Sequence, residues 1–143
     1  MIMEEGVEPD AVSAACAGAC RRCGNASRRG RWSGAYYLTG YSVECAMKAC
    51  IAKLTKRYDF PDKDRVLKSY THRIDTLAEL AGLKAELLDH MAESEAFLRH
   101  WGAVKDWDEK ARYRIWTQAQ ARMLSVAATD PLDGVLPWIM ARW

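Results

Sequence analysis

A cluster of arginines is the first feature of this chain that could do chemistry. Five arginines fall between positions 21 and 31, namely Arg21, Arg22, Arg28, Arg29 and Arg31. Guanidinium groups bind phosphate, so such a cluster could contact a nucleic acid or a nucleotide. The alternative is a solvated helix end, where arginine interacts favourably with the negative end of the helix dipole. Both interpretations stay open at this point.

A second basic segment mixes cations with aromatic rings. It runs through Trp101, Lys105, Trp107, Lys110, Arg112, Tyr113, Arg114 and Trp116. Aromatic rings can stack nucleobases while the neighbouring cations hold phosphates. The same composition also describes tryptophans that cover the end of a helical bundle while cationic side chains reach water.

Histidines and cysteines offer weaker signals. His72, His90 and His100 could transfer protons, although a structural role is the commoner one for each. Cys16, Cys20 and Cys23 have a spacing known from iron–sulfur enzymes, but they fall on one face of an alanine-rich helix. No fourth cysteine or histidine lies nearby to complete a tetrahedral site. We therefore expect buried thiols, with no metal and no cofactor.

The segment 32–54, WSGAYYLTGYSVECAMKACIAKL, must position these groups, because it predicts a long helix that is apolar on nearly every side. Such a helix lies at the centre of a bundle or crosses a membrane. Polar residues, among them Glu44 and Lys48, interrupt the apolar run, so a membrane span is not expected. Glu44 and Lys48 are four residues apart and can form an ion pair. This pair is either structural or the polar floor of a pocket.

The remaining pattern predicts an all-α fold, an up-and-down bundle of four to five main helices plus a short terminal helix. No stretch alternates with the period of a strand. The chain of 143 residues fits one domain, 1–143, with 1–10 as a flexible acidic start. The expected helices cover about 10–25, 33–57, 71–82, 84–100, 112–128 and 135–143, with exposed connections at 27–31, 59–69 and 101–109.

Charge and targeting signals add little about function. The net charge is only +2, and the start of the chain has no apolar segment of the kind found in secretory signal peptides. We therefore expect a cytoplasmic protein with reduced cysteines and no membrane association.

Residues 35–49, AYYLTGYSVECAMKA, resemble the signature helix of HEPN domains (higher eukaryotes and prokaryotes nucleotide-binding), whose pattern is YLxGYxVExxLKA. Further pieces agree in order along the chain and extend the resemblance over about 32–143: Thr71-His72, Trp107-x4-Arg112-Tyr113 and the segment 135–139.

The resemblance implies a helical bundle, often a homodimer, in a bacterial toxin–antitoxin or defence system. Many such proteins are paired with a minimal nucleotidyltransferase. Members are either metal-independent endoribonucleases or non-catalytic modules that bind nucleotide or RNA. The ribonucleases carry Arg-x4–6-His on a late helix, where histidine would act as acid or base and arginine would stabilise phosphate charge.

This chain departs from that pattern, because the expected helix at 112–128 contains no histidine. The spacing occurs only at Arg65 and His72, at the start of a short helix. We therefore expect a non-catalytic module that binds a nucleotide, RNA or a partner protein. Its binding residues would be Arg28, Arg29, Arg31, Arg112, Tyr113 and Arg114. The alternative is a metal-independent endoribonuclease that uses Arg65 and His72.

Overall fold

The computed structural model describes residues 9–28, 31–55, 60 and 62–143, with the side chains of the first helix described from 17 to 26. Within these ranges every regular element is helical, which confirms the all-α bundle. The expected acidic start falls mainly on residues 1–8, outside the described part. The elements are α1 (Pro9–Arg28), α2 (Trp32–Leu54), α3 (Lys63–Ser69), α4 (Ile74–Leu80), α5 (Lys84–Glu93), α6 (Glu95–Lys105), the 3-10 helix η1 (Glu109–Tyr113), α7 (Gln118–Thr129) and α8 (Val135–Met140).

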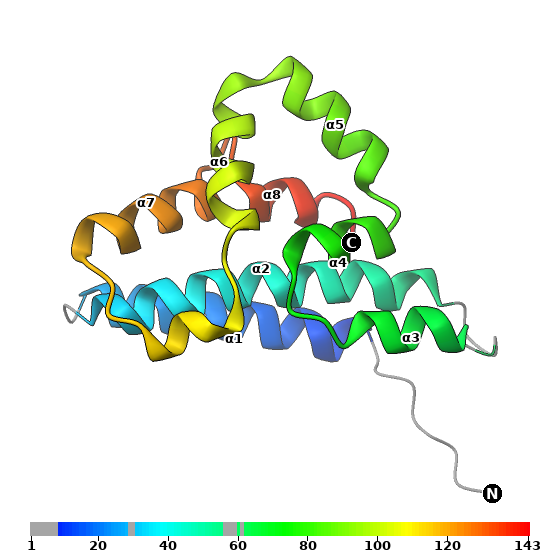
Figure 1. Ribbon diagram of the computed structural model, residues 1–143, viewed down its shortest axis with the longest axis horizontal. Coiled ribbons are helices and arrows are strands. Elements are labelled where there is room, and N and C mark those ends of the chain that lie inside the picture. The colour runs from blue at the N-terminus through cyan, green and yellow to red at the C-terminus, as the bar shows by residue number, and fades with distance from the viewer. Residues whose placement is uncertain (1–8, 29–30, 56–59, 61) are drawn as a thin grey trace, which may run out of the picture.

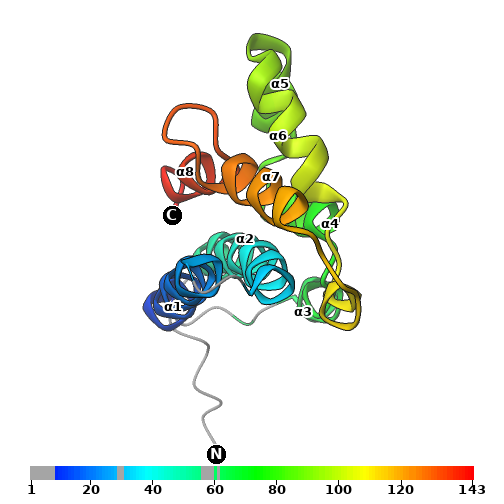
Figure 2. The ribbon, with the colours of Figure 1, turned by 90° about the vertical axis from the view of Figure 1, so that its left-hand side faces the viewer.

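Helix α2 lies at the centre of the bundle (Figure 1). α1 runs along one side of it, and α7 and α8 cross above it, while α3 and η1 lie on the side opposite α1 (Figure 2). Twelve of its residues are buried, and they point in nearly every direction around the helix. The all-round apolar sequence is therefore explained by neighbours on all sides.

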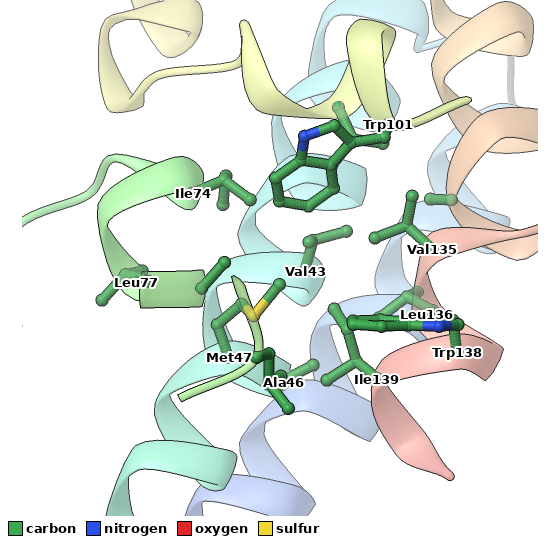
Figure 3. Close-up of a cluster of buried hydrophobic side chains, with 14 of the residues drawn as sticks. Val43, Ala46, Met47, Ile74, Leu77, Trp101, Val135, Leu136, Trp138 and Ile139 are labelled. Carbon is green, nitrogen blue, oxygen red and sulfur yellow. The ribbon is translucent and has the colours of Figure 1, made fainter. Parts of the chain in front are cut away.

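The centre of the hydrophobic core joins α2 to three later helices (Figure 3). Val43 and Met47 of α2 meet Ile74 of α4, Trp101 of α6 and Ile139 of α8, and each of these side chains is buried. Because the partners come from across the sequence, this packing fixes where the loops between the helices must lie.

Several expected boundaries were wrong. The segment 63–69 is a helix and not a connection, because Asp62 caps it by accepting a hydrogen bond from the backbone N–H of Asp64 at 3.1 Å. The expected helix 84–100 is broken at Ser94, and the expected loop at 101–109 is helical up to Lys105. The first helix continues to Arg28 and includes part of the basic segment.

The helix expected from residue 112 begins only at Gln118. Thr117 caps it through a capping box, in which the Thr117 hydroxyl accepts from the backbone of Gln120 and the Gln120 side chain accepts from the backbone of Thr117. Arg114 and Thr117 have an extended backbone, and 114–117 form no helix. Of the three residues expected to bind phosphate or bases, Arg112 and Tyr113 therefore lie on η1 and Arg114 follows it.

Candidate functional site

One face of α2 contacts two segments that carry candidate residues, the one around Trp116 and the one at His72. Ser33, Tyr37, Gly40, Glu44 and Lys48 recur every three or four residues, so they share this face, which we call the α2 contact face. From Ser33 to Glu44 it extends over about 16 Å, at 1.5 Å per residue. Trp116 contacts this face at Ser33, Trp107 contacts it at Tyr37 and Gly40, and His72 contacts it at Glu44. Lys48 pairs with Glu44 within the helix.

At the N-terminal end of this face, Trp116 is held against α2. Its backbone N–H donates to Ser33 Oγ at 2.9 Å, and its ring stacks on Tyr36 with centroids 3.6 Å apart. The indole Nε1 donates to the Ala111 carbonyl at 2.9 Å. Burial, with a further effect of the negative Asp108, raises the pKa of the Tyr36 phenol, so this ring stays neutral at physiological pH. Trp116 therefore fixes the segment that precedes it.

The fixed segment presents Arg112, Tyr113 and Arg114 to solvent. The Arg112 guanidinium lies 4.7 Å from the centroid of the Tyr113 ring, and that ring is 76% exposed. All three predicted binding residues are thus accessible. Arg31 is also exposed, and it lies two residues before Ser33, at the end of α2 that Trp116 contacts.

We define the basic–aromatic surface as Arg31, Arg112, Tyr113 and Arg114. The structure brings together parts of two groups that are far apart in sequence, because Trp116 links the segment after η1 to the start of α2. The side chains of Arg28 and Arg29, which were predicted to belong to the same site, lie outside the described residues.

The tryptophans of the second basic segment take different places. Trp101 and Trp107 are buried in the core, so neither can stack a nucleobase. The Trp107 ring covers Gly40, where a Cβ atom would overlap three atoms of the indole. For these two rings the bundle-covering interpretation is correct, and Tyr113 is left as the exposed aromatic ring of the surface.

Further along the α2 contact face, Glu44 forms the predicted ion pair with Lys48. The Lys48 Nζ atom lies 2.8 Å from Glu44 Oε1, and the Glu44 side chain is only 2% exposed. His72 joins the same oxygen, with its Nδ1 at 2.9 Å. A carboxylate only accepts hydrogen bonds, so the His72 Nδ1 is the donor. The other ring nitrogen, Nε2, makes no part of this bond, and the His72 side chain is half-exposed. The second oxygen, Oε2, is buried and has no partner within the described residues.

Arg65 and His72 are not joined in the structure. Arg65 is exposed on α3, and within the described part of the chain no hydrogen bond or ion pair connects it to His72. The contact that orients His72 is the one to Glu44. Spacing could not reveal that contact, because the two residues are 28 positions apart.

The other histidines have structural partners. The His90 ring meets Phe97 edge-on, with centroids 4.4 Å apart. His100 is hydrogen bonded through Nδ1 to the Asp133 carbonyl at 2.8 Å, which ties α6 to the turn before α8. Both agree with the structural role expected for them.

The described cysteines behave as small core residues. The Cys23 thiol lies 2.7 Å from the Thr39 hydroxyl, between α1 and α2. Burial raises the pKa of the Cys45 and Cys50 thiols, so both are protonated at neutral pH. Among the described side chains, which exclude that of Cys16, no three potential ligands gather in a way that could hold a metal ion.

Comparison of the chain with protein-family models, with curated proteins and with solved structures finds no match. No helix in the described ranges is both long and apolar enough to cross a membrane.

Proposed function

We propose that this chain is a cytoplasmic, HEPN-like protein that binds single-stranded RNA without cleaving it, through the basic–aromatic surface. The observation that carries the proposal is the exposed Arg112–Tyr113 pair. It lies in a segment that Trp116 joins to α2 through its hydrogen bond to Ser33. A free nucleotide or a partner protein in a toxin–antitoxin or defence system are the other ligands that the HEPN resemblance suggests.

The chemistry of this surface suits a single strand. The Tyr113 ring has Arg112 against it and is 76% exposed, so a nucleobase can stack on the accessible part of the ring. Such stacking is sequence-tolerant and is worth about 1–3 kcal/mol per base. Arg31, Arg112 and Arg114 are cations that can neutralise neighbouring phosphates.

The support under the surface favours binding over a merely solvated charge cluster. Because the Trp116 ring is stacked on Tyr36 and its backbone is bonded to Ser33, the nearby residues 112–114 are held close to α2. A ligand that binds there loses less free energy to ordering the protein than it would on a free loop.

A metal-independent endoribonuclease based on Arg65 and His72 is the alternative. It receives less support, because no hydrogen bond or ion pair joins Arg65 to His72 among the described residues, and the histidine Nδ1 is bonded to Glu44. Cleavage of RNA in EDTA that disappears in His72→Ala would favour this alternative over pure binding.

Fluorescence anisotropy with a labelled, unstructured RNA tests the proposal. We expect Tyr113→Ala to weaken binding by about tenfold, which corresponds to about 1.4 kcal/mol of lost stacking. Arg112→Gln combined with Arg114→Gln should weaken it further. The matched control is Lys84→Gln with Arg99→Gln, which removes the same charge from α5 and α6, where both side chains make only exposed ion pairs. Undetectable binding, or equal effects of both pairs, would contradict the proposal.

A further inference from the structure

A cavity of about 460 Å³ lies at the C-terminal end of α2. Its wall comes from three parts of the chain: the last turn of α2, the turn between α4 and α5, and the residue just beyond the C-cap of α8 (Figure 1). Small-molecule sites commonly have volumes of about 300–1,000 Å³. Lys53, which lines the cavity, follows Ser33 by twenty residues of α2, about 30 Å along the helix. The cavity is therefore separate from the basic–aromatic surface.

Three charged side chains line this cavity, Lys53, Glu86 and Arg142. Glu86 is neutralised by Arg142, whose Nε atom lies 2.7 Å from Glu86 Oε2. Lys53 makes no ion pair with any residue that the structure describes. Two cations and one carboxylate give the lining a net charge of +1. A ligand with one negative charge would balance it.

Arg142 is held in place by three contacts. In addition to the bond to Glu86, its Nη1 donates to the Trp138 carbonyl at 2.8 Å. Its guanidinium also lies 4.0 Å from the centroid of the Trp138 ring. The two hydrogen bonds use two of the five N–H donors of a guanidinium, so the others can serve a ligand. Because the group is already ordered, a ligand loses little free energy to fixing it.

The remaining wall is mainly apolar. Leu54 and Leu83 line it, together with Cys50, which is 5% exposed. Burial raises the pKa of the Cys50 thiol, and the positive charges of Lys53 and Arg142 act on it in the opposite direction. The thiol is protonated at neutral pH and adds no negative charge to the wall. Both cations therefore lie close to one buried, uncharged group, and apolar side chains flank them.

We propose that this cavity binds a small carboxylic acid with an apolar body, whose carboxylate lies between Lys53 and Arg142. The apolar body packs on Leu54 and Leu83, which removes surface from water on both sides. A phosphate monoester carries about −1.5 to −2 at neutral pH, which exceeds the charge of the lining. An uncharged molecule would gain nothing from the two cations. The inference goes beyond RNA binding, since no residue of the basic–aromatic surface lines the cavity.

Titration of the isotope-labelled protein with octanoate, followed by NMR at the Gly82 and Leu83 amides, tests the proposal. Both residues line the cavity. We expect saturable shifts with a dissociation constant of about 1 mM or tighter. 1-Octanol has the same chain without the charge, and it should bind at least about tenfold more weakly.

Lys53→Gln should weaken octanoate binding by about fivefold, the upper end for an exposed charge contact. Its melting temperature should match that of the wild type, because the Lys53 side chain is exposed and has no ion pair among the described residues. The matched control is Lys84→Gln, which removes a cation from the start of α5 outside the cavity and should leave the affinity unchanged.

Three results would each overturn the proposal: shifts that do not saturate, equal affinities for octanoate and 1-octanol, or an unchanged affinity in Lys53→Gln. Tighter binding of octyl phosphate than of octanoate would also overturn it, because the cavity would then select a phosphate ester. The Arg112→Gln/Arg114→Gln variant should bind octanoate as the wild type does, which separates a failure at this cavity from a failure of RNA binding.

Discussion

Among the described side chains, Glu44 is the only charged one that is buried, and both of its partners contact the same oxygen. Lys48 and His72 are 31% and 44% exposed, so either can turn to water if the carboxylate is removed. Glu44 has no such freedom. The two sides of the cluster therefore differ. Removing Lys48 and His72 should lower the free energy of unfolding more than removing the Glu44 carboxylate.

This asymmetry predicts the effect of removing both partners. Lys48→Met combined with His72→Ala leaves a buried, unpaired carboxylate, and we expect the free energy of unfolding to fall by about 3 kcal/mol, the lower end for breaking a buried pair. Adding Glu44→Leu should recover at least half of that loss, because the buried charge is then gone. Urea denaturation of the two variants measures both values.

A triple variant no more stable than the double variant would show that the charge of Glu44 is not the cause. If instead Glu44→Ala reduced only RNA binding and left the melting temperature unchanged, the carboxylate would be the floor of a binding pocket and not part of the scaffold.

Gly40 is required by the Trp107 ring. A Cβ atom at this position would overlap the indole, which is itself buried. We expect Gly40→Ala to lower the free energy of unfolding by about 1–3 kcal/mol, since overpacking outweighs the gain in helix propensity. Thermal unfolding followed by circular dichroism measures the change.

Gly102 provides the matched control. It is also helical, but a Cβ atom there would meet nothing within 4 Å. Gly102→Ala should therefore stabilise the protein by about 0.5–1 kcal/mol. Equal effects of the two substitutions would contradict the role assigned to Trp107.

The four-residue spacing of Glu44 and Lys48 predicted their contact, because both lie on one helix. It could not predict His72 as the third member, which comes from a later segment. The signal that was available is the recurrence of Ser33, Tyr37, Gly40, Glu44 and Lys48 on one face of α2. Small and polar residues on a helix that is otherwise apolar indicate where other segments approach closely.

Among the helices, Ser94 divides the segment 84–100, which the sequence predicts to be one helix, into α5 and α6. Its hydroxyl accepts from the Phe97 backbone N–H at 3.1 Å and donates to Asp133 Oδ1 at 2.7 Å. The break turns α6 back toward the core, where Phe97 and Trp101 are buried. The sequence did not reveal this break, because the apolar residues keep their helical spacing across it and no proline or glycine marks the position.

We expect Ser94→Ala to lower the free energy of unfolding by about 1 kcal/mol, the usual cost of losing an N-cap. Asp133→Ala should cost less, because the cap bond to Phe97 remains. Urea denaturation distinguishes the two. A larger loss in Asp133→Ala would mean that the link between α6 and the turn before α8, and not the cap, holds the break.

At the scale of the whole molecule, the sequence predicted the helical class and the central position of α2, since both follow from composition and periodicity. It grouped Arg31 with Arg112 and Arg114 from residue type alone and did not predict the contacts that hold them. Arg31 and Arg114 come to the same end of α2 through tertiary contacts, among them those of Trp116. Arg65 and His72, which are close in sequence, share no hydrogen bond or ion pair in the described part of the chain.

In the RNA-binding proposal, Arg112 and Arg114 neutralise phosphates of a bound single strand. The most direct test is the salt dependence of the RNA affinity of the wild type and of Arg112→Gln/Arg114→Gln. Each phosphate contact contributes about 0.7 to the slope of log K against log salt concentration for single strands. The variant should therefore have a slope smaller in magnitude by about 1.4, whereas equal slopes for the two proteins would contradict the account.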